Sequence, residues 1–357
     1  MKLRRLVDRE LPVASCPETC VGRTVTRSGK RTTIVDIARR AEVSISTVSR
    51  VLNGRPVSDE VLATRVRKAA TELGYRPNVV ARDFRRGVTS TIGVVVPDLA
   101  NPFFPHVLKG LAEEVSAGDH RLLVVDSGED AEQEPQLVAQ LAGSCDGIIL
   151  CSPRMPQSSL ATLPALGVPI VCTNRSVGTL PFGNVGIDSA AGMRQAVAHL
   201  AELGHRHIGY LGGPGTSWSE GLRREGLRSA AADHGVQVSA TEAGSTSDDG
   251  HAKLPGLLDK RVTAVIAFND LVAIGALARL RELELDVPSQ LSVVGFDDIP
   301  VAAFLGPPLT TVSLPKEELG RRAWAALHTQ LQTGRAPSEE LLPAALVVRQ
   351  STAAPAG

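Results

Sequence analysis

Seven short apolar runs after Thr91 constrain the fold more than any other feature of the sequence. They are TIGVVVPD, RLLVVDS, DGIILCS, PIVCTN, HIGYLGG, VTAVIAFN and LSVVGFD, and helical stretches separate most of them. Continuous apolar strands joined by crossover helices are typical of parallel sheets that are covered on both faces. The region is long enough for two such units. We therefore predict an α/β body built from two doubly wound parallel-sheet subdomains.

Polar residues end several of these apolar runs. Asp98, Asn174, Asn269 and Asp297 each follow a strand-like segment. Open parallel sheets bind ligands in the crevice beyond the carboxyl ends of their strands, so we expect these side chains to mark a ligand crevice. Asp297 and its neighbour Asp298 diverge at an extended strand end, which disfavours an acid–base dyad and favours one carboxylate that accepts ligand hydrogen bonds.

The motifs of common enzymes are missing from the body. The stretch LGGPG at 211–215 follows a strand but has neither the GxGxxG pattern nor the lysine of a P-loop, and no GxSxG elbow occurs. His205 and His207 stand at the entry to a strand, where an ordinary loop role is favoured over metal binding. We expect no catalytic residue, no cofactor and no metal.

Charge is distributed unevenly along the 357 residues, although the formal net charge is zero. Residues 1–90 contain 19 Lys and Arg against 9 Asp and Glu, whereas the rest contains 19 against 29. A basic first quarter on an acidic body indicates a polyanionic partner for the N-terminal part alone.

Helical periodicity begins immediately after residue 32. Ile34, Ile37, Ala38 and Ala41 recur at i, i+3, i+4 and i+7, which is one face of a helix. After a very short break, Ser44 is a candidate N-cap for a second helix. Two short helices joined by three or four residues make a helix-turn-helix, whose second helix lies in the DNA major groove.

The second helix has a polar face suited to DNA. Val48, Val51 and Leu52 supply its apolar side and point back at the first helix. Short hydroxyl side chains on the other side let the backbone approach phosphates, and Arg50 can form two hydrogen bonds to a guanine edge. A third helix at about 59–73 closes the headpiece with an apolar face, and Gly74 ends it. We assign to that face Val61, Leu62, Val66, Ala69, Ala70 and Leu73.

Six blocks of the chain resemble the LacI/GalR family of bacterial transcription regulators, in the family's order and spacing. They are TIVDIARRAEVSISTVSRVLNG, ELGYRPNVVAR, TIGVVVPDLANPFF, AFNDLVAIGAL, SVVGFDDIP and PPLTTV. The resemblance covers about residues 32–350. It implies that Ile45, Ser46 and Arg50 read bases. It also implies contacts to phosphates from a further set of side chains: Thr33, Ser44, Thr47, Ser49 and Asn53.

The segment 78–86 resembles the family's hinge helix, which inserts an apolar side chain into the minor groove. The resemblance implies DNA contacts for Ala81, Phe84 and Arg85. Phe84 departs from the family's usual leucine but can still unstack a base step. Glu42 is a second departure, because the turn usually carries glycine there. If that position needs a positive φ, the glutamate costs on the order of 1 kcal/mol.

In the body, the resemblance implies a periplasmic sugar-binding fold with a small-molecule effector between two lobes. The matching positions give Phe103 and Phe104 as apolar or stacking walls. They give polar contacts from five residues: Asn174, Arg175, Arg223, Asn269 and Asp297. The stretch EAGSTSDDG lacks an aromatic that several members place beside the ligand; Trp218 either substitutes for it or serves in the core or in a lid. Amide, carboxylate and guanidinium groups beside aromatic walls suit a polyol, so a sugar is favoured over a purine.

We therefore predict a ligand-controlled transcription regulator, most simply a repressor, that binds a pseudo-palindromic double-stranded DNA operator as a homodimer. It would be cytoplasmic and nucleoid-associated, with no membrane segment. The expected segments are a basic extension (1–31), a headpiece (32–77), a hinge (78–90), a two-lobed body (91–350) and a tail (351–357). The five cysteines are expected to be reduced. Two alternatives are a sugar transport receptor and an enzyme with a regulatory DNA domain.

Overall fold

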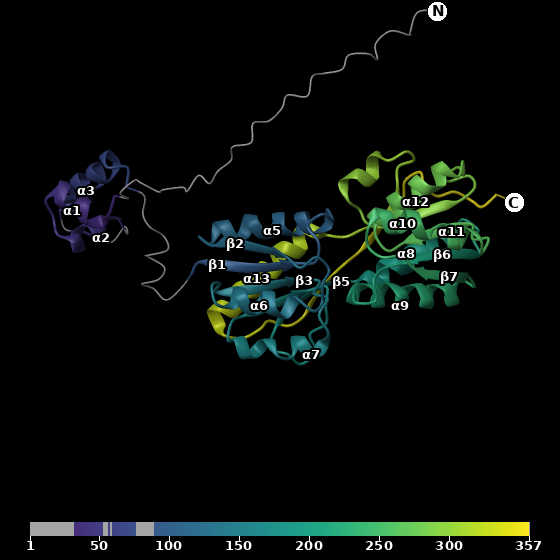
Figure 1. The fold of residues 1–357 in the computed structure, drawn as a ribbon, viewed down its shortest axis with the longest axis horizontal. Helices are drawn as coiled ribbons and strands as arrows, with labels where there is room; N and C mark the ends of the chain where they lie inside the picture. Colours follow the sequence, from purple (N-terminus) through teal and green to yellow (C-terminus); the bar gives the residue numbers. More distant parts are fainter. Residues whose placement is uncertain (1–31, 53–55, 58, 76–88, 357) are drawn as a thin grey trace, which may run out of the picture. The chain divides into compact units, whose positions relative to one another are not determined.

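In the computed structural model of the chain, the described residues are 32–52, 56–57, 59–75 and 89–356. Internal contacts divide the chain into two compact units, residues 1–82 and 83–357. Figure 1 labels the helices and strands of both units.

The described residues of the first unit form three helices around a small apolar core. They are α1 (Ile34–Ala41), α2 (Ile45–Leu52) and α3 (Glu60–Glu72). Thr33 caps α1 in a reciprocal capping box with Asp36. The hydroxyl of Ser44 accepts a hydrogen bond from the Thr47 amide at 3.1 Å, which confirms the cap expected for α2.

The helices of this headpiece bury most, but not all, of the side chains that the periodicity predicts. Ile37, Val48 and Val66 are fully buried. The expectation for Val61 was wrong, because its side chain is 70% exposed and Ala63 takes the buried place instead. The rest of the predicted stripe holds, but Val61 lies four and seven residues before Arg65 and Lys68, on the exposed face of α3.

Glu42 ends α1 in the left-handed region, with φ 54° and ψ 47°. The left-handed conformation costs an L-residue about 1–2 kcal/mol, and glycine avoids this cost while losing roughly 0.5–1 kcal/mol more backbone entropy on folding. The Glu42 carboxylate lies 3.8 Å from the Arg65 guanidinium. Because the Glu42 side chain is 86% exposed, this ion pair adds little to the stability of the headpiece.

We therefore expect Glu42→Gly to stabilise the headpiece by about 0.5–1 kcal/mol. Amide hydrogen exchange in α1 and α2 of the full chain should slow by about twofold to fivefold. Glu42→Ala is the control, because it removes the carboxylate but keeps the Cβ, and it should not slow exchange. Equal slowing in both variants would assign the effect to the charge instead.

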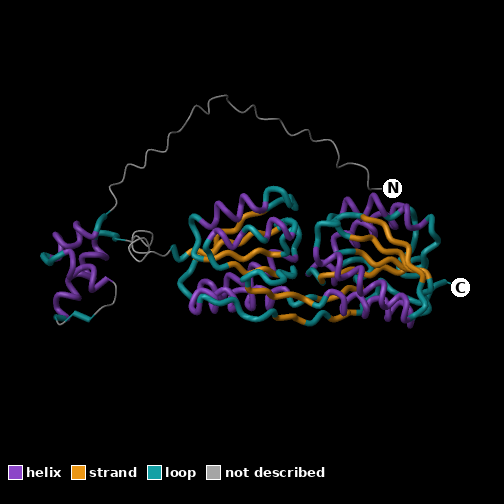
Figure 2. Tube along the Cα trace, turned by 90° about the horizontal axis from the view of Figure 1, so that it is seen from below, coloured by secondary structure: helices purple, strands orange, loops and turns teal. Residues whose placement is uncertain are grey.

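In the second unit, residues 89–356 form two six-stranded sheets, and each has helices on both faces (Figures 1 and 2). The first sheet is entirely parallel, in the order β11-β5-β4-β3-β1-β2. Helices α5 and α13 pack on one face and α6 on the other. The strands of this first lobe are β1 (Thr91–Val96), β2 (Arg121–Asp126), β3 (Gly147–Cys151), β4 (Ile170–Thr173), β5 (Gly183–Ile187) and β11 (Glu340–Leu342). Its helices are α5 (Phe103–Ala117), α6 (Glu134–Ala142), α7 (Gln157–Leu160), the 3₁₀ helix η1 (Leu163–Leu166) and α13 (Lys316–Thr333).

The second sheet has the order β12-β10-β9-β8-β6-β7 and is parallel except for β12. Helices α8 and α9 pack together on one side, and α10 packs with α12 on the other. The strands of this second lobe are β6 (His207–Gly212), β7 (Gln237–Glu242), β8 (Ala264–Ala267), β9 (Ser292–Asp297), β10 (Thr310–Ser313) and β12 (Ala345–Val347). Its helices are α8 (Ser189–Glu202), α9 (Trp218–Asp233), α10 (Ser247–Lys253), α11 (Pro255–Leu258), α12 (Asp270–Glu282) and the 3₁₀ helix η2 (Pro300–Phe304).

The predicted fold class is confirmed, and all seven apolar runs are strands. The sequence analysis missed five strands: β5, β7, β10, β11 and β12. They are short, glycine-bearing or polar on alternate positions, so their apolar signal is weak. The chain passes between the lobes three times, after β5, after β10 and between β11 and β12.

The tail expected after residue 350 belongs to the packing of the second lobe. Ser351 is fully buried, and its hydroxyl donates to the Val293 carbonyl at 2.6 Å and accepts from the Thr310 amide at 2.8 Å. His205, which is also buried, shares a hydrogen bond of 2.9 Å with the carbonyl oxygen of Ala353. Hydrogen bonds from the C-terminal segment at 351–353 therefore stabilise β9 and β10 in the second lobe.

We expect Ser351→Ala to destabilise the body by about 2 kcal/mol, because it leaves two backbone groups without their partner in a dry site. The midpoint of thermal unfolding should fall by several degrees. The exposed neighbour Gln350 provides the control, since Gln350→Ala should leave the midpoint within about one degree. A Ser351→Ala midpoint equal to that of the control would show that the C-terminal segment adds no stability.

No helix in the described part of the chain is long and apolar enough to cross a bilayer. Cys145, Cys151 and Cys172 are buried free thiols. Burial raises the pKa of Cys151 and of Cys172 to about 12, so neither is a reactive thiolate near neutral pH.

Candidate functional site

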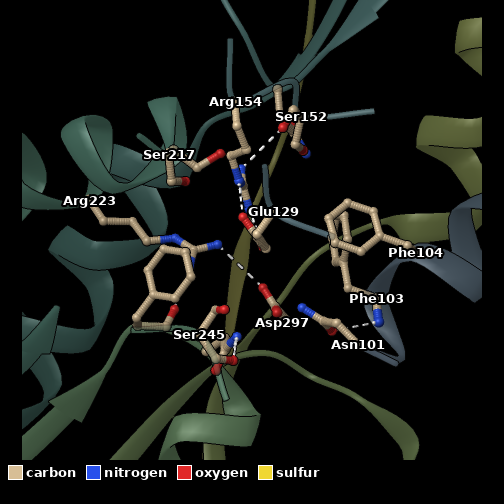
Figure 3. A pocket seen from close by; sticks show the side chains of 14 residues that line it. Asn101, Phe103, Phe104, Glu129, Ser152, Arg154, Ser217, Arg223, Ser245 and Asp297 are labelled. Atoms are coloured by element: carbon tan, nitrogen blue, oxygen red, sulfur yellow. Dashed lines mark hydrogen bonds and ion pairs between the residues drawn. The ribbon is translucent and has the colours of Figure 1, made fainter. Parts of the chain in front are cut away.

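A cleft lies where carboxyl ends of strands from both lobes meet, and the space in and before it, open solvent included, is about 380 Å³ (Figure 3). Fourteen residues line it, and their side chains converge on one space. The first lobe contributes Asn101, Phe103, Phe104, Glu129, Ser152, Arg154 and Asn174. The second contributes Ser217, Ser219, Arg223, Ser245, Phe268, Asn269 and Asp297.

Arg223 and Asp297 form the charged centre of the second lobe's wall. One guanidinium nitrogen of Arg223 lies 3.3 Å from the Asp297 carboxylate, and another donates to the Phe268 carbonyl. The guanidinium lies over two aromatic rings, 4.5 Å from the centroid of Phe268 and 3.9 Å from that of Phe296. Both charged side chains are only 6% exposed, so the cation is held rigidly against its carboxylate.

Burial raises the pKa of Asp297 to about 6, against the opposing effects of Arg223 and Lys316. Lys316 is itself buried at the start of α13, and its ammonium group donates to the carbonyls of Asp297 and Asp298. Asp298 turns away from the cleft and pairs with Arg349 at 2.6 Å. The two adjacent carboxylates thus diverge, as the sequence analysis expected, and only Asp297 lines the cleft.

Arg154 and Glu129 form a second ion pair in the first lobe. The guanidinium of Arg154 donates to both carboxylate oxygens of Glu129, and its third donor reaches the Ser152 carbonyl at 3.1 Å. Behind them, the buried carboxylate of Glu134 accepts hydrogen bonds from the backbone amides of Arg154 and Met155 at 2.8 and 2.7 Å. Burial raises the pKa of Glu134, and these two amides partly offset that effect.

Aromatic rings cover part of the cleft wall. Phe103 and Phe104 begin α5 and contact each other edge to face, with ring centroids 5.2 Å apart. Asn101 fixes this helix start, because its side-chain oxygen accepts from the Phe103 amide at 3.0 Å. Phe268 supplies a ring from the second lobe. The cleft therefore has apolar faces between its polar groups.

Polar atoms without partners point to a polar ligand. The side-chain oxygen of Asn174 and the hydroxyl of Ser217 are buried and have no hydrogen-bond partner within the protein, and both residues line the cleft. The Nε group of Arg223 is in the same state. Buried polar groups that lack partners are costly, and a ligand that supplies hydroxyl groups would satisfy them.

The backbone at the rim of the cleft is strained. Four lining residues other than glycine have positive φ: Glu129 (61°), Ser152 (48°), Asn174 (51°) and Asp297 (109°). Each such residue costs on the order of 1 kcal/mol, and such strain concentrates at ligand sites. The strained turns after β2, β3, β4 and β9 direct these side chains into the cleft.

The structure brings six of the seven expected effector residues to the cleft: Phe103, Phe104, Asn174, Arg223, Asn269 and Asp297. Asn269 also caps α12, since its side-chain oxygen accepts from the Val272 amide at 2.8 Å. Arg175 does not line the cleft. Its guanidinium lies 5.4 Å from the Trp218 ring centroid and donates to the Pro153 carbonyl. Asp98 does not line the cleft either and instead accepts from the Ala100 amide.

Sequence reasoning missed more than half of the lining residues. Glu129 and Arg154 lie three residues beyond the ends of β2 and β3, in turns that the sequence analysis did not inspect. The rule that placed Asn174 and Asp297 would have found them if it had been applied to every strand end. Ser217, Ser219 and Ser245 carry no such signal, because serine is common in any loop.

The headpiece offers a second candidate site on α2. Ser44, Ile45, Ser46 and Arg50 are exposed, and Ile45 shows 50% of its surface although it is apolar. Thr47 and Ser49 are half-buried. The hydroxyl of Thr33 is engaged in the cap of α1. The remaining expected DNA contacts lie outside the described residues: Asn53, Ala81, Phe84 and Arg85.

Among the described residues, no cluster of three or more His, Cys, Asp or Glu side chains could hold a metal ion. His207 instead shares a hydrogen bond with the Ser239 hydroxyl at 2.9 Å.

Two family profiles match the chain. Residues 33–78 match the profile described as bacterial regulatory proteins of the lacI family, and residues 197–352 match that of a periplasmic binding protein-like domain. The first profile covers the helix-turn-helix, and the second covers most of the second lobe.

Similar proteins share this arrangement over almost their whole length. The transcriptional repressor CytR of Escherichia coli (strain K12) is 34% identical over 331 residues, which is 90% of this chain and 96% of CytR. The structure of the lac repressor dimer bound to operator and the anti-inducer ONPF has a TM-score of 0.84 at 28% identity, covering 91% and 100% of the two chains. The complex of the transcriptional regulator CelR with cellobiose has a TM-score of 0.67 at 31% identity, covering 90% and 100%.

Proposed function

This chain belongs to the lacI family of bacterial regulatory proteins, and we propose from that premise that a sugar in the cleft controls how tightly the headpiece binds its operator. The chain is a DNA-binding transcriptional regulator with a periplasmic-binding-like body. Its relatives are transcriptional regulators rather than enzymes or transport receptors. Acting on the chromosome, it would be associated with the nucleoid.

One observation carries the ligand half of this proposal. The cleft holds buried polar atoms without partners, on Asn174, Ser217 and Arg223, beside phenyl rings. A sugar matches both features, because its hydroxyl groups supply donors and acceptors while its C–H faces stack on aromatic rings. The solved structure of CelR is a complex with cellobiose. This similarity favours a carbohydrate over a purine as the ligand of the present chain.

We assign roles in the cleft by chemistry. Asp297 accepts hydrogen bonds from ligand hydroxyls, Arg223 and Asn174 bind ligand oxygens, and the rings of Phe103 and Phe104 form a wall. Asn269 has one side-chain N–H left for the ligand after its bonds to the Val272 amide and the Ser245 carbonyl. We keep Arg175 as a further candidate, since its buried Nε group has no partner.

In the headpiece, we propose that Ile45, Ser46 and Arg50 read base edges in the major groove. Thr33, Ser44, Thr47, Ser49 and Asn53 would contact phosphates. The exposed apolar side chain of Ile45 supports this assignment, because a thymine methyl group offers an apolar partner for it. For the hinge at 78–90, we propose that Ala81, Phe84 and Arg85 engage the minor groove.

We propose a homodimer on a pseudo-palindromic operator, like the operator-bound dimer of the lac repressor. An exposed apolar patch in the second lobe fits a second copy of the chain. On the 3₁₀ helix η2, Val301 and Phe304 are 44% and 85% exposed and lie one turn apart on one face.

The proposal is tested by mobility shift on promoter DNA from around the chain's own gene, against random duplex of equal length. Specific binding that weakens steeply as salt rises, and that changes when a sugar is added, is expected. The direction of that change decides between inducer and co-repressor. If affinity for the promoter never exceeds that for random duplex, with or without sugars, the proposal is wrong. A response to purines alone would keep the regulator and replace its ligand.

A further inference from the structure

The charged side chains that line the cleft form two closed pairs, one in each lobe. Glu129 pairs with Arg154 in the first lobe, and Arg223 pairs with Asp297 in the second. The lining thus carries two positive and two negative charges. Figure 3 shows both pairs facing the same space, with dashed lines joining their partners.

The pairing in the first lobe leaves little positive charge for a ligand. Arg154 is only 5% exposed and binds Glu129 through two parallel N–H···O contacts, the strongest arrangement that guanidinium and carboxylate form. The Lys316 ammonium donates to three backbone carbonyls and points at none of the open space. An anion entering the cleft would therefore lose its water shell without gaining a free cation.

The backbone of Glu129 indicates that its position is functional. It has φ +61°, directly after Gly128 at the same φ, and its amide donates to the Pro97 carbonyl at 2.7 Å. A glutamate in the left-handed region is held there against its own preference. This backbone conformation directs the carboxylate to Arg154 rather than to solvent. The strained turn therefore preserves the ion pair that neutralises the charge of the lining.

We propose that Glu129 is a specificity-determining residue, which neutralises Arg154 so that the cleft selects neutral sugars and excludes sugar phosphates and sugar acids. The inference rests on the proposed sugar-binding function and narrows its ligand class.

Arg175 is the residue that could defeat this selection. Its guanidinium is buried, has an unpartnered Nε group and forms no ion pair among the described residues. Its guanidinium lies against Trp218, however, and the nearby charge of Glu134 acts on it. If Arg175 turned to the cleft on binding, the site would prefer an anion.

Matched ligand pairs test the proposal on the full chain by isothermal titration calorimetry. The probes are aldopentoses and aldohexoses, each paired with its terminal phosphate, and D-glucose and D-galactose paired with D-glucuronate and D-galacturonate. For at least one neutral sugar, we expect binding at least tenfold tighter than that of its anionic partner. Glu129→Gln should reduce this ratio at least tenfold, mainly by strengthening the anionic partner. The control Glu132→Gln removes an exposed carboxylate on the same turn and should leave the ratio unchanged.

Three results would overturn the proposal. They are a wild-type preference for the anionic partner, a ratio that Glu129→Gln does not move in a folded protein, and no binding of any of the neutral sugars at millimolar concentration. The wild-type ratio needs no variant, so the test stands even if Glu129→Gln fails to fold. Failure here is distinguishable from failure of the proposed function, because a sugar phosphate, a sugar acid or a nucleoside that altered operator binding would keep the ligand-responsive regulator.

Discussion

Arg50→Ala is expected to weaken binding to the operator by about tenfold to 100-fold and binding to random duplex by at most a few-fold. A bidentate contact to guanine contributes about 1–3 kcal/mol of discrimination, whereas one phosphate contact acts alike on every sequence. Arg50 is exposed on α2, so its loss removes no core packing. Mobility shifts on both DNAs, at two salt concentrations, give the ratio.

Arg67→Ala is the matched control, because it removes the same charged group from the exposed face of α3, where Arg67 pairs with Glu60 at 2.9 Å. It should leave the ratio of operator to random affinity unchanged. An equal loss on both DNAs for Arg50→Ala would mean that Arg50 contacts only phosphate. The salt dependence separates these cases further, since a lost phosphate contact lowers the slope by about one.

Asp297→Asn is expected to lower sugar affinity by at least about 100-fold. The carboxylate accepts hydrogen bonds from ligand hydroxyls as a charged group, and hydrogen bonds to charged groups contribute about 1.5–3 kcal/mol each. Operator binding in the absence of sugar should persist. Calorimetry with whichever sugar binds the wild-type protein measures the loss.

Asp298→Asn is the control for this prediction. Asp298 is the next residue in the chain, but its partner is Arg349 and it does not line the cleft. Sugar affinity should change less than about threefold. If both variants bound sugar as the wild type does, Asp297 would have no part in the site.

The pH dependence follows from the same carboxyl group. Its pKa in the free protein is raised to about 6, so Asp297 is increasingly protonated as the pH falls below 6. A ligand that needs the carboxylate binds best above this pH, and its affinity should fall by about tenfold for each unit below. Asp297→Asn should remove this dependence. An affinity that stayed constant from pH 7 to pH 5 would contradict the assignment.

Particular residues show how much of the ligand site could be predicted from the sequence. Asn174 and Asp297 were found because a strand end is legible in the sequence, and the carboxyl ends of parallel strands meet at one edge. Glu129 and Arg154 were missed although the same rule reaches them, since no motif draws attention to a turn. Arg175 follows Asn174 directly, yet a strand end turns successive side chains to different sides, and the structure directs it to Trp218 instead.

The sequence by itself determined the fold class, the helix-turn-helix with the Ser44 cap and the sign of the charge on each part. The fold class and the helices depend on local periodicity and on short-range hydrogen bonds such as that of Ser44, which join residues close together in the chain. The charge of each part follows from counting its residues. Only the tertiary structure decided that Glu129 closes on Arg154, that Arg223 is held between two phenyl rings, and that Ser351 fastens β9. Each of these contacts joins residues 25 to 74 positions apart. Their energies depend on burial and on the distance between atoms, and the folded chain sets both.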